Sequence, residues 1–390
     1  MTTQALITPE LVTWARRRRE LSAEGLASKV GVSVERVKSW EAGSDYPSWP
    51  QADHLATQLS VPIGYLFLST PPENVVQIPD LRTTSQAAAQ PLSPDFQEVL
   101  DDALRKQDWY REHLEQQNSE SLTFIGQFPH DAPAALVAAS IRDTLGIDSA
   151  MRDRTTSSEQ FLTGLVRLAE RVGVLVLRTG IVGSNTHRPL STDEFRGFAL
   201  SDSLAPLILL NSKDAKTAQA FTFAHELAHL WVGQSGVSNP NYRETNISQP
   251  NAIERHCDLI AAETLVPLTQ LESEWDDQRA AADNSERLAR AFRVSRFVIY
   301  RRALEAGKIT TQEYRGVLPQ LLAPQRAIAQ ESGGNYFANV LARNSPMFTS
   351  TLVAATSEGR VSRPEAASLL NIVNLATLSK FQAYLQADGS

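Results

Sequence analysis

The stretch that decides the fold of this chain is FTFAHELAHLWV, residues 221–232, with His225, Glu226 and His229 at its centre. Two histidines four residues apart on a helix project from one face, so both imidazoles can reach one metal ion. Glu226 lies between them, where its carboxylate can take a proton from a bound water. The pattern is a zinc-hydrolase signature and predicts Zn²⁺ as the cofactor. The apolar flanks predict that this helix is buried, where two unpaired imidazoles would be costly.

A catalytic zinc site needs a third protein ligand, and the helical stretch at residues 252–267 (AIERHCDLIAAETLVP) can supply it. Glu254 and Asp258 are four residues apart on one face. In this arrangement the glutamate can bind zinc while the aspartate orients a ligand histidine. The Glu-x-x-x-Asp pattern resembles that of the gluzincin class of metalloproteases. The alternative is a solvated stripe of a surface helix, with Glu263 as a competing ligand.

Composition narrows the class of protein. The chain has 390 residues and is 42% hydrophobic, which is enough for two to four domains with apolar cores. A lone cysteine, Cys257, excludes a disulfide framework and is expected to be a small buried residue. Met1–Leu6 is too short and polar for a signal peptide, and apolar runs such as Leu204–Leu210 are too short to cross a bilayer. We therefore expect a soluble, cytoplasmic, bacterial-type protein with no membrane contact.

Residues 1–70 carry a second pattern, in which short helices are joined by a glycine turn. The expected helices are 9–19, 23–30, a third from the cap Ser33 to Gly43, and 50–59, which together describe a helix-turn-helix unit. The string LASKVGVS, followed by Trp-Glu-x-Gly, resembles the phage-repressor-like (XRE) family over about residues 9–68. That resemblance implies that helix 33–40 enters the major groove of double-stranded DNA. The side chains expected to face DNA are those of Ser33, Glu35, Arg36, Lys38 and Ser39.

The charge of this N-terminal segment leaves a second interpretation open. Its 7 Lys and Arg are balanced by 7 Asp and Glu, so its net charge is zero. Binding to the DNA backbone draws affinity from cation–phosphate contacts, and the whole chain carries −7. The alternative is a dimerisation or partner-binding module with the same fold, which would make the chain a homodimer.

The segments around the zinc helix predict a compact α+β domain. Residues 75–94, with three prolines, indicate a linker, and helical periodicity follows at 95–117 and 132–145. The expected elements of the metal domain are a helix at 161–171, strands at 172–178, 195–201 and 206–211, and the zinc helix at 215–231. An exposed strand edge beside the zinc would let an extended peptide add on through backbone hydrogen bonds.

The run RGFALSD, APLILLN, AFTFAHELAHLWV and IERHCDLIAAETLVP resembles the ImmA/IrrE family of metallo-endopeptidases over roughly residues 160–305. The resemblance implies a regulator that cleaves a repressor-type DNA-binding protein. It assigns His225, His229 and Glu254 as zinc ligands and Glu226 as the catalytic base. Ala228 departs from the pattern, because many members have glycine there, and a methyl group should be tolerated.

Other segments carry weaker signals. The spacing of Leu26 to Val37 recurs from Leu288 to Ile299, so residues 286–304 are either a second helix-turn-helix pair or a structural lid on the metal domain. A second electrophile often holds the oxyanion in such sites. The nearby candidates are Tyr242, Arg243 and His256.

The sequence therefore predicts a multidomain chain. Its parts are an all-α helix-turn-helix domain (1–70), a linker and helical connector (71–157), an α+β zincin-like domain of gluzincin type (158–310) and a helical C-terminal interaction region (311–390). The predicted function is a zinc-dependent regulatory endopeptidase that cleaves a repressor- or antitoxin-type partner. The alternative is a DNA-binding transcriptional regulator or antitoxin whose zinc domain is structural or sensory.

Overall fold

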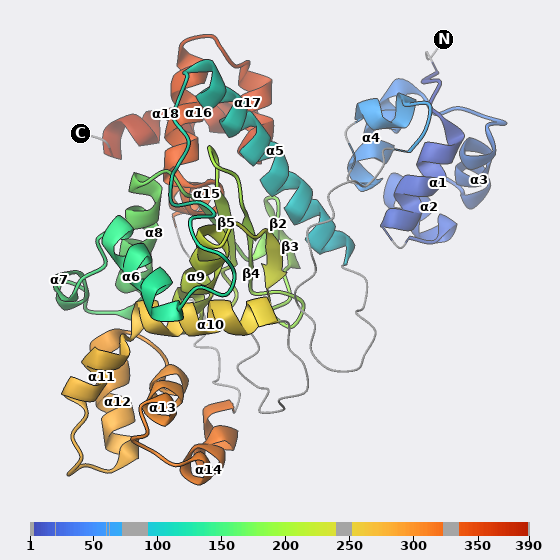
Figure 1. Ribbon diagram of the computed structural model, residues 1–390. Coiled ribbons are helices and arrows are strands. Elements are labelled where there is room, and N and C mark those ends of the chain that lie inside the picture. The colour runs from blue at the N-terminus through green and yellow to red at the C-terminus, as the bar shows by residue number, and fades with distance from the viewer. Residues whose placement is uncertain are drawn as a thin grey trace. The chain divides into compact units, whose positions relative to one another are not determined.

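The structure, a computed structural model, describes residues 4–19, 21–59, 61, 63–71, 93–238, 252–322 and 335–388. The chain divides into two compact units, one of residues 1–77 and 92–98 and the other of residues 78–91 and 99–390 (Figure 1). Within the described ranges, no helix is long and apolar enough to span a membrane. The candidate residues Tyr242 and Arg243 lie outside these ranges. So does the predicted linker at 75–94, except for its last two residues.

The first unit is helical and contains the four helices that its sequence predicts. They are α1 (Pro9–Arg18), α2 (Ala23–Val30), α3 (Val34–Ala42) and α4 (Trp49–Leu59), followed by the 3-10 helix η1 (Ile63–Phe67). The Ser33 hydroxyl accepts a hydrogen bond from the Arg36 backbone N–H and so starts α3. Gly31 ends α2 with φ 74°, a left-handed conformation that favours glycine and turns the chain into α3. Val37, Trp40 and Leu55 pack together in the core of this unit.

The second unit is built on a small mixed sheet with strand order β1-β5-β4-β6. The strands are β1 (Leu175–Thr179), β5 (Leu207–Asn211), β4 (Gly197–Leu200) and β6 (Gly236–Ser238), and β2 (Ile181–Val182) pairs separately with β3 (Asn185–Pro189). β1 and β5 are parallel, whereas β4 is antiparallel to both β5 and β6. Every residue of β5 is buried, as expected for an apolar central strand. The three predicted strands are confirmed as β1, β4 and β5.

Helices pack around this sheet (Figure 1), and those between residues 134 and 305 share one apolar core with it. The helices before the sheet are α5 (Pro94–Gln116), α6 (Ala134–Leu145), α7 (Ser149–Asp153) and α8 (Ser158–Arg171); α9 (Lys216–Trp231) and α10 (Ala252–Leu265) follow it. α9 packs against β4, β5 and α8, and α10 packs against α9 and α6. Phe223 and Trp231 of α9 and Ile260 of α10 are fully buried members of that core.

The sheet has a fourth strand that the sequence does not predict. The outer edge of β4 is not open, because β6 pairs with it, placing Gly236 opposite Ala199 and Ser238 opposite Gly197. The chain reaches this position through Gly233, which has φ 70° and packs against the backbone of Gly126. β6 has only three residues, so its sequence carries no alternating pattern long enough to predict a strand.

Residues 281–305 repeat the turn geometry of the first unit but not its exposure. α11 (Leu268–Glu274) leads into α12 (Ala281–Phe292), α13 (Arg296–Glu305) and α14 (Thr311–Leu322). Arg293 ends α12 with φ 58°, and the Ser295 hydroxyl caps α13 as Ser33 caps α3. The middle of α13 is buried, including Val298 and Ile299, which belong to the core around α9 and α10. Of the two interpretations, burial therefore favours the packed lid.

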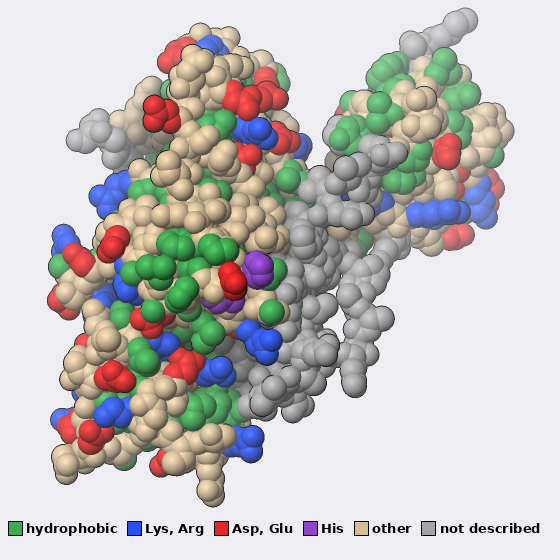
Figure 2. Space-filling model, in the orientation of Figure 1, with side chains coloured by type: hydrophobic (Ala, Val, Ile, Leu, Met, Phe, Trp, Pro, Cys, Tyr) green, Lys and Arg blue, Asp and Glu red, His purple; other side chains and the backbone are tan. Residues whose placement is uncertain are grey.

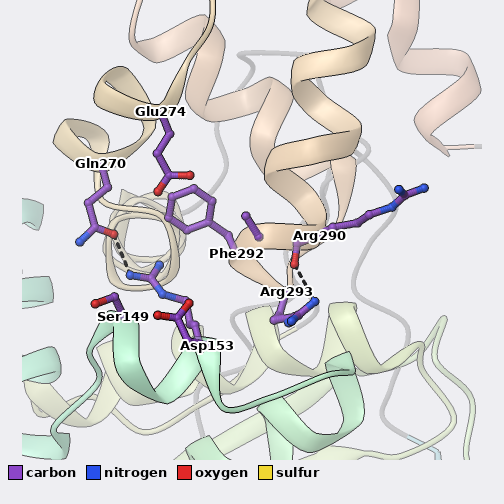
Figure 3. Close-up of a pocket in the computed structure, with 9 residues that line it drawn as sticks. Ser149, Asp153, Gln270, Glu274, Arg290, Phe292 and Arg293 are labelled. Carbon is purple, nitrogen blue, oxygen red and sulfur yellow. Dashed lines mark hydrogen bonds between the residues drawn. The ribbon is translucent and has the colours of Figure 1, made fainter.

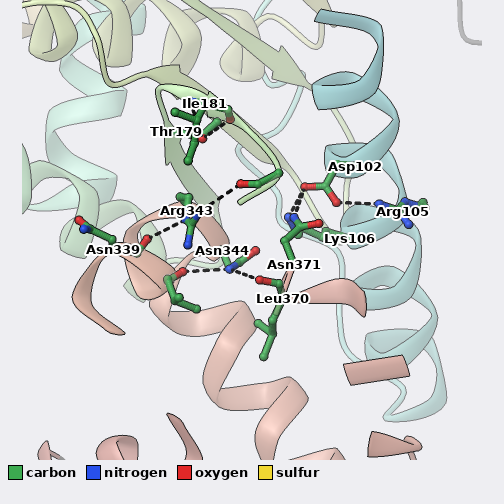
Figure 4. A network of polar contacts seen from close by, with 12 residues as sticks. Asp102, Arg105, Lys106, Thr179, Ile181, Asn339, Arg343, Asn344, Leu370 and Asn371 are labelled. Carbon is green, nitrogen blue, oxygen red and sulfur yellow. Dashed lines mark hydrogen bonds and ion pairs between the residues drawn. The ribbon is translucent and has the colours of Figure 1, made fainter. Parts of the chain in front are cut away.

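The C-terminal helices are tied to the rest of the second unit by partly buried polar contacts (Figure 4). They are α15 (Tyr336–Asn344), α16 (Pro346–Ser357), α17 (Arg363–Leu369) and α18 (Leu375–Asp388). Asp102 of α5 forms an ion pair with the buried Lys106 and accepts a hydrogen bond from Asn371 Nδ2 at 2.9 Å. Arg343 of α15 donates to the Gly183 carbonyl at 3.1 Å, and α15 packs against β1.

A second buried contact joins α8 to the start of α16. Glu170 is 9% exposed, and its Oε1 accepts a hydrogen bond from Ser345 Oγ at 2.6 Å. Burial raises the pKa of Glu170 to about 7, although the hydrogen bonds from Ser345 and the Met347 backbone and the charge of Arg178 oppose this shift. The ionised carboxylate is therefore less stable in the folded chain than in the unfolded one.

We predict that Glu170→Gln makes the second unit more stable than wild type at high pH but not at low pH. The folded-state pKa is raised, so the wild-type penalty is absent below about 4.5, grows as the unfolded carboxyl ionises, and is complete above about 7. The difference in unfolding free energy between the two proteins should change by roughly 3 kcal/mol across that window. Urea unfolding of both proteins from pH 4 to pH 8 measures it, and a difference independent of pH would contradict the prediction.

Candidate metal centre

The metal-binding signature lies on a helix with almost no contact with solvent. From Gln219 to Trp231, every residue of α9 is buried, and His225, Glu226 and His229 are 0% exposed. The helix is apolar around most of its circumference, so it lies between the sheet and α10 instead of presenting one face to water. Its three ionisable side chains must therefore find partners inside the protein.

α10 supplies the partners of the two histidines, because Glu254 lies across from both. Glu254 Oε2 is 3.2 Å from His225 Nε2, Glu254 Oε1 is 3.0 Å from His229 Nε2, and the two Nε2 atoms are 3.1 Å apart. Within the described residues, these three side chains form a group whose ligand atoms all lie within 4.8 Å of one another, as holding a metal ion requires.

Asp258 lies behind the same site. Its Oδ1 accepts a hydrogen bond from His225 Nδ1 at 2.9 Å, and this contact assigns the ring hydrogen of neutral His225 to Nδ1. In this neutral form, which is the one that binds a metal, the Nε2 lone pair of His225 is turned toward Glu254. Burial opposes protonation, but the charges and hydrogen bonds of Glu254 and Asp258 raise the pKa of His225 well above its ordinary value, so a metal would have to displace that proton. A carboxylate that orients a ligand histidine in this way fixes its tautomer and raises its basicity. The sequence prediction for Asp258 describes the same contact.

The chemistry of the donor set fits a divalent cation. Two imidazole nitrogens and one carboxylate converge, and these are the N and O ligands that zinc takes in catalytic sites. Burial by itself would raise the pKa of Glu254, but the charges and hydrogen bonds of His225 and His229 lower it to about 2. Glu254 is thus held as a carboxylate, the form in which it can bind a metal.

The competing ligand Glu263 lies elsewhere on α10. It forms an ion pair with the buried Arg302, and its Oε2 also accepts the Leu268 N–H at 3.2 Å. Arg302 in turn donates to the Val266 carbonyl at 3.0 Å. Glu263 therefore joins α10 to α13 and is not part of the group that could hold a metal.

The remaining residues singled out from the sequence are not gathered at this site. His256 lies on α10, where burial lowers its pKa, the charge of Asp131 opposes this shift and that of His130 reinforces it. Cys257 is buried, as expected, and burial raises the pKa of its thiol well above the ordinary value. The five candidate DNA-contacting residues lie in the first unit; Ser33, Glu35, Arg36 and Lys38 are exposed, and Ser39 is half-buried.

The structure adds one residue that sequence reasoning did not single out. Gly197 begins β4, and a Cβ built on it would lie 3.0 Å from Glu226 Oε1 and 2.7 Å from Thr222 Cγ2. A glycine inside a buried strand often marks a close approach of another chain segment, so the signal was present in the RGFALS stretch.

A cavity of about 490 Å³ lies away from the metal group, between α7, α11 and α12 (Figure 3). The Arg152 guanidinium lies 4.8 Å from the centre of the Phe292 ring and donates to Gln270 Oε1 at 2.7 Å. The cavity wall carries both signs of charge, with Arg152, Arg290 and Arg293 beside Asp153 and Glu274. Arg152, one of the cations of this wall, thus already interacts with protein side chains.

We predict that Asp258→Asn weakens Zn²⁺ binding by about 10- to 100-fold without abolishing it, because His225 keeps its place but loses its charged partner. Glu263→Gln, on the same helix but paired with Arg302, should leave the affinity unchanged. Isothermal titration of both variants with Zn²⁺ tests the assignment. Equal affinities for Asp258→Asn and wild type would show that Asp258 does not support the ligand.

Comparison with known proteins agrees with this geometry. A search among curated proteins gave no match to the chain. Residues 169–304, which include α9, α10 and the three side chains that could hold a metal, match the peptidase family described as the IrrE N-terminal-like domain. The match supports the ImmA/IrrE family for this part of the chain, and with it a metallopeptidase-type regulatory function.

Proposed function

We propose that this protein is a zinc-dependent regulatory endopeptidase. The observation that carries the proposal is the convergence of His225 and His229 of α9 with Glu254 of α10. The buried Glu226 lies on α9 between the two histidines. A purely structural metal site needs no general base, so Glu226 favours a catalytic role. The family match over residues 169–304 supports the same class of activity.

In the proposed mechanism, His225, His229 and Glu254 would hold the ion and Asp258 would orient His225. When bound, zinc would polarise the scissile carbonyl and lower the pKa of a water molecule at the open position. Glu226 takes the proton of the attacking water on its carboxylate and passes it to the leaving amine nitrogen. Of the three candidate oxyanion stabilisers, Tyr242 and Arg243 lie outside the described residues, and His256 lies on α10 near the charges of Asp131 and His130.

The proposed substrate is a polypeptide, of the repressor or antitoxin type. An extended peptide can add to a sheet through backbone hydrogen bonds, and the outermost strand on the β4 side of this sheet is β6. A peptide in that position would pair with β6, the described strand next to β4, and α9 packs on β4. This geometry favours an unfolded or loop segment of a partner over a small molecule.

We predict that Glu226→Gln abolishes proteolysis while leaving Zn²⁺ content unchanged, because it removes the base and keeps all three proposed ligands. The test maps new protein N-termini in the native cell, with and without stress, for wild type and for the variant. New termini seen only with wild type would identify the substrate. Identical maps together with full zinc content would contradict the protease proposal.

A second candidate function is a DNA-binding regulator with a structural or sensory zinc domain. The observation that favours it is α3, which begins after a tight glycine turn and exposes Arg36 and Lys38. Arg36 Nε already lies 3.5 Å from Asp45 Oδ2, so the carboxylate offsets the positive potential that this arginine presents to a phosphate. Lys, Arg, Asp and Glu side chains are interspersed over the described surface that Figure 2 shows.

We predict that, if the first unit binds double-stranded DNA, Lys38→Ala weakens binding to all sequences and lowers the salt dependence of log K by about one unit. Lys213→Ala, an exposed lysine of the second unit, is the charge-matched control and should have no effect. Binding to promoter fragments at several salt concentrations measures both. Equal salt slopes for Lys38→Ala and wild type would favour the partner-binding interpretation of this unit.

A further inference from the structure

Gly197 lies where the sheet approaches Glu226, the proposed base on α9. It is the first residue of β4, a strand in which all four residues are buried. On one side it pairs with Leu210 of β5, and on the other with Ser238 of β6. α9 packs over both β4 and β5. The backbone of Gly197 is therefore enclosed by strands on two sides and by the metal helix above.

The missing side chain of Gly197 leaves room for two groups of α9. A Cβ at this position would lie 2.7 Å from Thr222 Cγ2 and 3.0 Å from Glu226 Oε1, and it would also lie 3.0 Å from the Leu209 carbonyl oxygen. Thr222 and Glu226 are four residues apart, so they lie one above the other on the same face of the helix. Carbon–carbon contacts of 2.7 Å are far inside van der Waals distance, so a side chain here would force α9 or the carboxylate to move.

We infer that Gly197 is a positioning residue for the catalytic carboxylate: without a side chain, it lets α9 approach β4 so closely that the Gly197 backbone limits where the Glu226 carboxylate can lie. The inference rests on the proposed function, in which Glu226 is the general base. The carboxylate is 0% exposed, so its position is set by the protein atoms around it. Catalytic groups work only when such surroundings hold them within a fraction of an ångström.

The competing explanation is that Gly197 serves helix–sheet packing alone. In that case the contact with Thr222 matters and the contact with Glu226 is incidental. The two explanations separate in a double-mutant cycle, because shortening one neighbour relieves only its own overlap. The cycle uses protein stability, so it needs neither a substrate nor peptidase activity.

The experiment measures Tm by thermal unfolding of the full chain for Gly197→Ala, Glu226→Ala and the double variant. If Gly197 supports the carboxylate, the double variant should recover about 2–4 °C of the Tm that Gly197→Ala loses. Glu226→Gln in place of Glu226→Ala should give no recovery, since glutamine fills the same space. Strictly additive Tm losses, with full recovery by Thr222→Ser instead, would overturn the inference.

Gly180→Ala is the matched control. Gly180 follows β1, and a Cβ there would lie 2.8 Å from Ser212 Oγ and 2.9 Å from Lys213 Cγ, away from the metal helix. Its Tm loss should be additive with that of Glu226→Ala. Coupling of similar size in this control would mean that the cycle reports general softening of the unit, and the inference would fail.

A spectroscopic readout tests the same inference without unfolding the protein. Co²⁺ bound at the site reports its immediate surroundings through its visible spectrum, recorded here at one fixed pH. Gly197→Ala should change that spectrum, whereas Gly180→Ala should not. An unchanged spectrum in Gly197→Ala would overturn the inference. If both readouts hold but wild type creates no new N-termini, the protease proposal fails while the support of Glu226 by Gly197 stands.

Discussion

The contact between α9 and α10 is the interaction on which the second unit depends. α9 carries two imidazoles and a carboxylate into an interior that excludes water, and α10 answers with Glu254 and Asp258. Without the contacts from Glu254 and Asp258, the buried imidazoles would oppose folding by several kcal/mol. The positions of these groups explain why α10 must pack on α9 in one register. Another carboxylate of α10, Glu263, lies about two and a half helical turns beyond Glu254 and holds α13 through Arg302.

The sheet imposes a second constraint from the other side of α9. β4 offers a glycine under Glu226, and the left-handed Gly233, packed on Gly126, brings β6 alongside β4 after the helix ends. Backbone therefore lies close to the proposed base where side chains would otherwise stand. Glycine is required at Gly197 and Gly233, because a Cβ at either position would lie 3.0 Å or less from an atom of the neighbouring segment.

Much of the secondary structure follows from local pattern. A β-branched run predicts β1, apolar runs predict β4 and β5, and the caps Ser33 and Ser295 mark where α3 and α13 begin. The sequence does not predict that β1 lies parallel to β5, or that β6 closes the edge of β4. Strand pairing joins residues far apart in the chain, and a three-residue strand carries too little periodicity to be recognised.

The candidate site divides in the same way. The spacing of His225, Glu226 and His229 by itself determined that three chemically matched groups share one helical turn, because helix geometry is local and regular. The sequence could only rank Glu254 above Glu263, since both lie on one helix with suitable chemistry. The tertiary structure separated them, and it alone brought Gly197 against Glu226. The physical reason is that which side of α10 faces α9, and how closely α9 approaches the sheet, depend on packing between distant segments.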